Sequence, residues 1–121
     1  MIFRDLAANL EAKLHKGKVL VLIGPRQVGK TTLINSILKE KEYLFLDGDD
    51  NTVTETLANA NTEILKSIIG NHKYVFIDEV QRIPNIGLKL KIIVDQIKDV
   101  QVIVSGSSSL DINKVTQEPL T

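Results

Sequence analysis

The chain carries Gly24-Pro25-Arg26-Gln27-Val28-Gly29-Lys30-Thr31-Thr32 immediately after an apolar run, Val19–Ile23, and before a stretch with helical spacing. This matches the pattern G-x-x-x-x-G-K-[ST] in the strand-then-helix context that such a match requires. Peptide N–H groups of a glycine-rich turn, together with a helix N-terminus, form a concavity for anionic oxygens. The stretch therefore predicts a phosphate-binding loop in a parallel α/β fold.

Within this loop, we expect all nine residues from Gly24 to Thr32 to line the phosphates of a nucleotide. Lys30 would lie against the β- and γ-phosphates as a point charge, and the Thr31 hydroxyl would bind Mg²⁺. Gly24 and Gly29 allow a close backbone approach that a Cβ would obstruct. The alternative is a strand–turn–helix joint that merely uses two glycines.

Bulk composition narrows the class of protein. The 121 residues are 43% hydrophobic, carry no net charge and contain no cysteine. This length suits one small domain or part of a larger one. No cluster of lysine and arginine marks a direct nucleic-acid site, and no apolar run is long enough for a membrane span. Met1–Asp5 does not resemble a secretory signal. We therefore expect a cytoplasmic protein whose partner is a nucleotide, and self-association into a homo-oligomer stays open.

Apolar runs and helical spacings alternate along the chain, which indicates a parallel sheet with right-handed crossovers. We predict a three-layer αβα P-loop NTPase fold, as one domain over residues 1–121, with the sheet truncated after the fourth strand because residues 110–121 are polar. The strand at 42–47 has a polar start and is expected near the sheet edge. Strands are predicted at 19–23, 42–47, 73–78 and 100–104, and helices at 3–15, 30–40, from a capping box at 52–55, at 62–69 and at 86–98.

Two acids follow the third predicted strand, and they complete the candidate site. Asp78 can hold Mg²⁺ through a coordinated water, and Glu79 can accept a proton from a water aligned with the γ-phosphate. Ligands of such sheets bind at the carboxyl ends of the strands, so this pair should meet the phosphate loop. Helix caps or surface charges are the alternative for both acids.

Other polar residues are weaker candidates. At the end of the fourth strand, the hydroxyl of Ser105 or Ser107 could orient the attacking water or touch the γ-phosphate, although the segment also has ordinary loop composition. Asp47–Asn51 contains three carboxylates, and we interpret it as a turn and helix cap rather than a metal site. Gln81 could face the nucleotide or a partner, and Arg82 is expected to be exposed.

Three motifs together resemble the N-terminal ATPase domain of a large prokaryotic group of predicted AAA-type ATPases. They are the loop at 24–32, Val-Phe-Ile-Asp-Glu-Val-Gln-Arg-Ile-Pro at 75–84 and Val-Ile-Val-Ser-Gly-Ser-Ser-Ser at 102–109. The resemblance implies a sheet ordered 5-1-4-3-2, ATP with Mg²⁺ as cofactors, Gly24–Thr32 on the phosphates (the Walker A motif), Asp78 and Glu79 as the acidic pair (the Walker B motif), and the region of Ser105 as a sensor.

Members of that group usually run to several hundred residues, with a C-terminal part that often resembles a restriction endonuclease. Their fifth strand, helical lid and arginine after the sensor find no counterpart in this sequence, which contains arginine only at positions 4, 26 and 82. We therefore expect a fragment of a longer protein, with reduced activity by itself, because an arginine finger can be worth about 10³ to 10⁵ in turnover.

Three functions are consistent with these residues. The leading hypothesis is an ATP-hydrolysing core that drives a conformational change in attached domains. The alternatives are a helicase-like translocase stimulated by nucleic acid, and a module that binds nucleotide without turnover. A GTPase switch is disfavoured because Gln81 stands where the Asp-x-x-Gly motif requires glycine.

Overall fold

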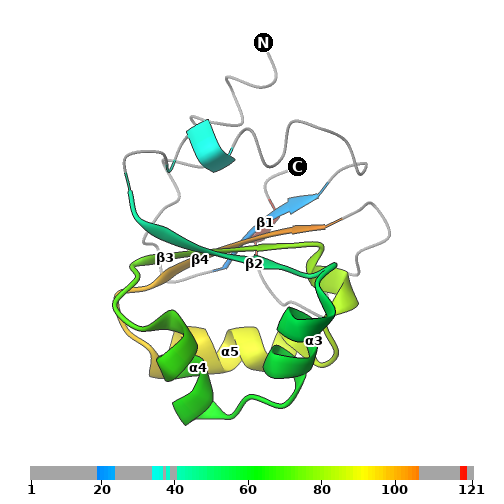
Figure 1. The fold of residues 1–121 in the computed structure, drawn as a ribbon. Helices are drawn as coiled ribbons and strands as arrows, with labels where there is room; N and C mark the ends of the chain where they lie inside the picture. Colours follow the sequence, from blue (N-terminus) through cyan, green and yellow to red (C-terminus); the bar gives the residue numbers. More distant parts are fainter. Residues whose placement is uncertain (1–18, 24–33, 37, 39–40, 107–117, 120–121) are drawn as a thin grey trace.

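The computed structural model describes residues 19–23, 34–36, 38, 41–106 and 118–119 of the chain (Figure 1). The predicted helix at 3–15, the predicted phosphate loop at 24–32 and Ser107 lie outside these residues. The elements are β1 (Leu20–Ile23), β2 (Tyr43–Asp47), α3 (Asn51–Ala58), α4 (Thr62–Ile69), β3 (Tyr74–Asp78), the 3₁₀ turn η1 (Val80–Arg82), α5 (Ile86–Gln96), β4 (Gln101–Gly106) and β5 (Glu118–Pro119). Residues 34–36 and 38 are also helical.

The strands form one parallel sheet in the order β2-β3-β4-β1-β5. This is the order 5-1-4-3-2 that the resemblance implied, and it confirms the alternation of strands and helices read from the sequence. Strand β2 lies at one edge, as its polar start predicted. The strand that precedes the phosphate loop, β1, lies between β4 and β5.

The prediction that the sheet stops after its fourth strand was wrong. Strand β5 pairs in parallel with β1, with Leu20 opposite Glu118 and Val21 opposite Pro119. A strand of two residues is too short to produce a recognisable hydrophobic period. Its proline cannot donate to a ladder, which restricts it to an outer strand and also disguises it as a loop in the sequence.

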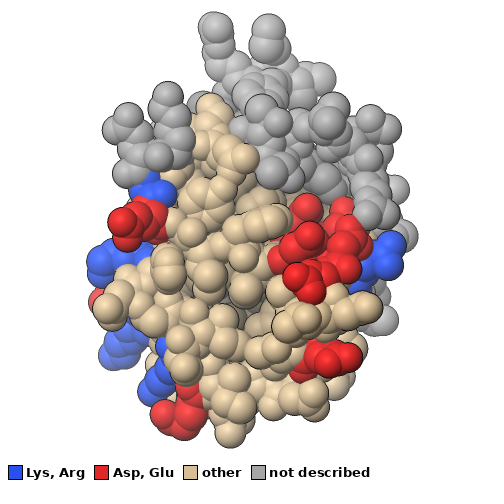
Figure 2. All heavy atoms as spheres, in the orientation of Figure 1, with Lys and Arg blue, Asp and Glu red and all other residues tan. Residues whose placement is uncertain are grey.

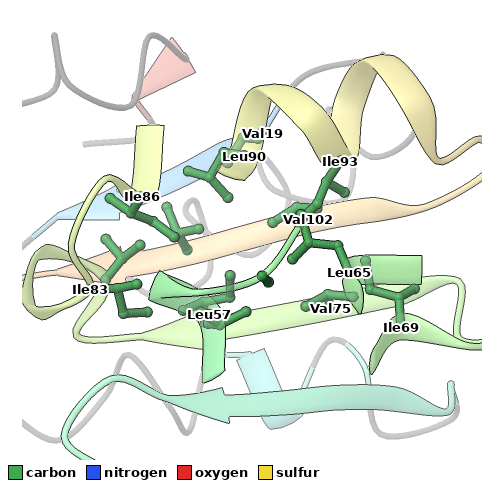
Figure 3. Packing of buried hydrophobic residues seen from close by; sticks show 14 of the residues in the cluster. Val19, Leu57, Leu65, Ile69, Val75, Ile83, Ile86, Leu90, Ile93 and Val102 are labelled. Carbon is green, nitrogen blue, oxygen red and sulfur yellow. The ribbon is translucent and has the colours of Figure 1, made fainter. Parts of the chain in front are cut away.

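One face of the sheet carries the larger core. Alternate residues of β1, β3 and β4 point toward α3, α4 and α5, which lie together below the sheet in Figure 1. In Figure 3, Leu90 and Ile93 of α5 extend toward Val102 of β4. The fully packed members include Val19, Val21, Leu57, Leu65, Ile69, Val75, Ile77, Leu90, Val102 and Val104.

The opposite face carries a second core, to which the helical residues Ile34 and Leu38 contribute. Buried side chains of β1, β3 and β4 pack with Ile34 and Leu38, and the Tyr43 hydroxyl donates a hydrogen bond to Asn35 Oδ1. The sheet is therefore covered on both faces, which explains why its central strands are continuously apolar in sequence. The strand members of this core are Leu20, Leu22, Phe76 and Ile103.

Helix boundaries follow local hydrogen bonds. The predicted capping box at 52–55 was wrong, because the N-cap of α3 is Asp50, whose side chain accepts from the Thr52 amide at 2.9 Å. The Thr52 amide therefore already has an acceptor in Asp50, and α3 begins at Asn51 rather than after Thr52. Helix α4 matches its prediction, with Asn61 as N-cap and Gly70 after its last residue. Helix α5 ends at Gln96 rather than 98, since Ile97 already has an extended backbone, with φ and ψ of -115° and 107°.

Among the described helices, none combines the length and apolar character that crossing a bilayer requires.

Candidate nucleotide-binding site

The candidate site lies at the carboxyl ends of the central strands, and register explains why its residues meet. Asp47 is the direct partner of Asp78, Ile77 is opposite Val104, and Ser105 is opposite Leu22. Successive pairs therefore bring Asp47, Asp78 and Ser105 into one row across β2, β3 and β4. In Figure 2, acidic side chains gather on this side of the molecule.

This row belongs to the second face of the sheet. Because side chains alternate along a strand, Asp78 points to the same side as Phe76, and Ser105 to the same side as Ile103. Both apolar residues pack against the helical segment at 34–38. In the sequence, that segment follows Gly29-Lys30-Thr31-Thr32. Asp78 and Ser105 thus lie on the sheet face that Ile34 and Leu38 cover.

The Asp78 carboxylate is held from two sides. Its Oδ1 accepts a hydrogen bond from the Ser105 hydroxyl and another from the Glu79 backbone amide at 2.9 Å. Ser105 is completely buried, and Asp78 is partly exposed. A hydroxyl that water cannot reach has little freedom to exchange partners, so Ser105 fixes the orientation of this carboxylate.

Glu79 has an unusual backbone for a residue other than glycine. Its φ and ψ are 50° and 48°, in the left-handed region, and Glu79 is only 4% exposed. Such conformations cost about 1–3 kcal/mol and persist only where the surroundings enforce them. They are also concentrated at active sites. The side-chain oxygen Oε1 of Glu79 accepts from Gln81 Nε2 at 2.8 Å.

Gln81 makes this contact at a cost. Within the described part of the chain, its own Oε1 is buried and finds no hydrogen-bond donor. Burying an unpaired amide oxygen costs about 1–3 kcal/mol. Gln81 therefore faces Glu79, to which its amide nitrogen donates a hydrogen bond. Its contact with a nucleotide or with a partner stays a prediction.

The turn after β2 supports the acidic pair from the outside. The Gly48 amide donates to the Asp78 carbonyl at 2.8 Å, and Arg82 Nε pairs with Asp49 Oδ1 at 2.7 Å. Arg82 is 53% exposed, as expected from the sequence. The Asp49 amide donates to Asp47 Oδ1 at 2.9 Å, which with the Asp50 cap confirms the turn-and-cap interpretation of this segment.

The phosphate loop itself, with the predicted roles of Arg26, Lys30 and Thr31, lies outside the described residues. Strand β1 ends at Ile23, one residue before Gly24, and Ile23 is the register partner of Gly106. The loop therefore starts beside the strand that carries Ser105. The described residues include no group of three or more metal-ligating side chains.

The sequence singled out Asp78, Glu79 and Ser105 as candidates but gave no sign of the contacts that Gly48 and Gln81 make with this segment. Asp47-Gly48-Asp49-Asp50 reads as ordinary turn chemistry, and nothing in that pattern reveals a contact with the end of another strand. The spacing of Gln81 from Glu79 is local, but the hydrogen bond depends on the left-handed backbone between them.

This fold and this edge of the sheet define a class of protein: three layers around a parallel sheet, with an acidic pair and a buried hydroxyl beside the strand that leads into a glycine-rich loop. That is the architecture of P-loop NTPase-like proteins. Residues 16–121 match the family model described as AAA domain, and the chain therefore belongs to the AAA domain family, a family of nucleotide-binding ATPase domains.

Two uncharacterized proteins and one solved structure are similar to the chain. The uncharacterized proteins Rv2008c of Mycobacterium tuberculosis and Mb2031c of Mycobacterium bovis are each 33% identical to the chain over 118 residues, or 97% of it. The chain spans 26% of the length of these relatives. A DNA replication initiation factor of known crystal structure superimposes with a TM-score of 0.56 at 16% identity, covering 98% of this chain and 43% of that one. This last likeness confirms the α/β fold alone.

Proposed function

We propose that this chain binds ATP with Mg²⁺ and that, in the full-length protein, it hydrolyses the β–γ phosphoanhydride bond. The observation that carries the proposal is the pair of hydrogen bonds that orient the Asp78 carboxylate beside a buried Glu79, on the sheet face that also holds the helix following the phosphate loop. Membership of the AAA domain family supports the same conclusion.

The described residues fit this cofactor. Mg²⁺ prefers carboxylate and hydroxyl oxygens together with water, and Asp78 offers a carboxylate whose orientation is fixed by Ser105. When bound, ATP with Mg²⁺ supplies the scissile phosphoanhydride and the charge that neutralises its oxygens. Lys30, Thr31 and the other residues of Gly24–Thr32 would bind the phosphates, and Thr31 would share the ion with Asp78.

Glu79 performs the proton transfer in this proposal. One carboxylate oxygen takes the proton of a water, and Oε1 is kept in place by Gln81 Nε2. The site excludes bulk water from Glu79, which is almost wholly buried. Ser105 acts through Asp78, as a positioning residue in the place where the sequence suggested a sensor.

Replacing the base while keeping its shape tests the proposal. Glu79→Gln in the full-length protein should lower kcat for ATP hydrolysis by about 10²- to 10⁴-fold, because a positioned general base contributes that much. Binding of a fluorescent ATP analogue should stay within about threefold, since the phosphate loop is untouched. Glu55→Gln, an exposed glutamate on α3, is the matched control and should leave both quantities unchanged.

Two outcomes separate the parts of the proposal. If the Glu79 variant hydrolyses ATP at the parental rate while still binding it, Glu79 is not the base. If the parental protein binds no ATP in the presence of Mg²⁺, the proposed nucleotide is wrong.

We further propose that turnover drives a conformational change in attached domains, of which the nuclease-like domain implied by the resemblance is one candidate. Limited proteolysis with ATP and with ADP tests for that change.

A further inference from the structure

We propose that Gly48, at the end of β2, is a positioning residue for the reaction: its bare α-carbon lets the turn after β2 press against the Asp78–Glu79 backbone and so holds Glu79 in its left-handed conformation. This inference rests on the proposed function. It adds a residue from the edge strand to a site otherwise built from the phosphate loop, β3 and β4.

The contact is closer than any other residue type permits. A Cβ built on Gly48 would lie 2.2 Å from the Glu79 carbonyl oxygen and 2.6 Å from the Asp78 carbonyl oxygen. Both neighbours are backbone atoms, which cannot rotate away as the end of a flexible side chain can. The Gly48 amide also donates to the Asp78 carbonyl at 2.8 Å, so the turn is bonded to the segment that it touches.

Backbone conformation is not the reason for glycine here. Within the described residues, the glycine with a positive φ is Gly70, at 56°, and Gly48 is not in that region. Alanine could adopt the Gly48 backbone without strain, and the obstacle is the close approach alone. Gly48 therefore differs from an ordinary turn glycine, whose role is to supply a left-handed φ.

The same two segments are joined a second time. Arg82, at the end of η1, pairs with Asp49, the residue after Gly48. Glu79 lies between the bonded Asp78 carbonyl and this ion pair, so the turn after β2 holds the chain on both sides of the left-handed residue. Within the segment held in this way, Gln81 Nε2 donates a hydrogen bond to the Glu79 carboxylate.

The size of the effect follows from the distances. To restore an ordinary contact of 3.4 Å, Gly48→Ala must push the Glu79 carbonyl away by about 1 Å, and a misplacement of that size can lower a rate by about 10²-fold. We expect Gly48→Ala in the full-length protein to lower kcat for ATP hydrolysis at least tenfold. The KM for ATP should stay within about threefold, because phosphate binding does not depend on Glu79.

Gly70→Ala is the matched control. It introduces the same methyl group at a positive φ after α4, where a Cβ would lie 3.9 Å from the Ser67 carbonyl oxygen, remote from the acidic pair. It strains the fold without touching Glu79 and should keep the parental kcat. A double variant separates positioning from general damage: in a Glu79→Gln background, Gly48→Ala should cause no further loss of rate.

Several results would overturn the inference. They are a parental kcat for Gly48→Ala, an equal loss for Gly70→Ala, or a full additional loss in the Glu79→Gln background. If Gly48→Ala does not fold, Arg82→Ala tests the same link and should lower kcat by about two- to fivefold, the range of an exposed ion pair. An unchanged rate in that variant would also refute the proposal.

Failure of the proposed function is distinguishable from failure of this inference. If the parental protein does not hydrolyse ATP, the proposed function fails, and the positional claim is judged by NMR. The coupling between the amide and α protons of Glu79, read together with the nuclear Overhauser effect between the same two protons, distinguishes a left-handed φ from a negative one. It should leave the left-handed value in Gly48→Ala and keep it in Gly70→Ala, and an unchanged coupling in Gly48→Ala would refute the role of Gly48.

Discussion

Ser105→Ala removes the hydroxyl that holds the Asp78 carboxylate and changes little else. Ser105 is completely buried, and its Oγ donates to Asp78 Oδ1. A hydrogen bond to a charged group contributes about 1.5–3 kcal/mol, and water cannot replace a donor at a fully buried position. After the substitution, Oδ1 keeps the Glu79 amide as its donor. We therefore expect a loss of about 2 kcal/mol in the free energy of unfolding.

Urea denaturation without nucleotide measures this loss. With an m value of about 2 kcal/mol per molar urea, the unfolding midpoint should fall by about 1 M. Ser67→Ala, at an exposed position of α4, is the matched control and should change stability by less than about 0.5 kcal/mol. Circular dichroism and intrinsic tyrosine fluorescence should give the same midpoint for each variant if unfolding is two-state.

A double-mutant cycle identifies the partner. In an Asp78→Ala background the hydroxyl has lost its acceptor, so Ser105→Ala should cost close to nothing, and the coupling energy should be about 1.5 kcal/mol or more. The reasoning is refuted if Ser105→Ala costs less than about 0.5 kcal/mol in the parental protein. It is equally refuted if the cost is the same in both backgrounds, because the hydroxyl would then act through another group.

Two further predictions concern the fold. Phe76→Ala should destabilise the protein by about 3–5 kcal/mol, because Phe76 is fully buried in the second core. Phe45 is half-exposed, with its ring centroid 5.6 Å from that of Phe76, and Phe45→Ala should cost about 1 kcal/mol. Thermal unfolding of both variants checks the ratio of the two losses in stability. Asp50→Ala removes the N-cap of α3 and should cost about 0.5–2 kcal/mol in urea denaturation, and a cost no larger than that of Glu55→Ala on the same helix would contradict the cap.

The sequence predicted the strands well because the sheet is buried on both faces. Such strands appear as continuous apolar runs, and Val19–Ile23 and Tyr74–Ile77 are of this kind. The order of the strands could not be predicted in this way, because no local pattern encodes which strands are neighbours. The predicted order came from the resemblance instead. The fifth strand escaped notice because two residues carry no period. At α3, Asp50 and Thr52 are both good caps, and the chain uses the first.

The candidate site was predictable as far as it depends on residue type at strand ends. Asp78 and Glu79 follow an apolar run, and Ser105 ends another. What could not be predicted arises from contacts between distant segments. The bond between Ser105 and Asp78 depends on the register of β3 with β4, and the approach of Gly48 to Glu79 depends on that of β2 with β3. Glu79 could not be recognised as left-handed, because glutamate rarely adopts that conformation.

The position of β1 in the sheet bears on how the chain assembles during synthesis. Among the described strands β1 comes first along the chain, yet Leu20 pairs with Ile103 and with Glu118, so both neighbours of β1 are made after the other strands. Strands β2, β3 and β4 can join in sequence, each to the next, before β1 has its neighbours. Contacts so distant along the chain slow folding. We infer that insertion of β1 beside β4 is the late step, and that a nascent chain arrested before it is the form most exposed to aggregation and most in need of a chaperone.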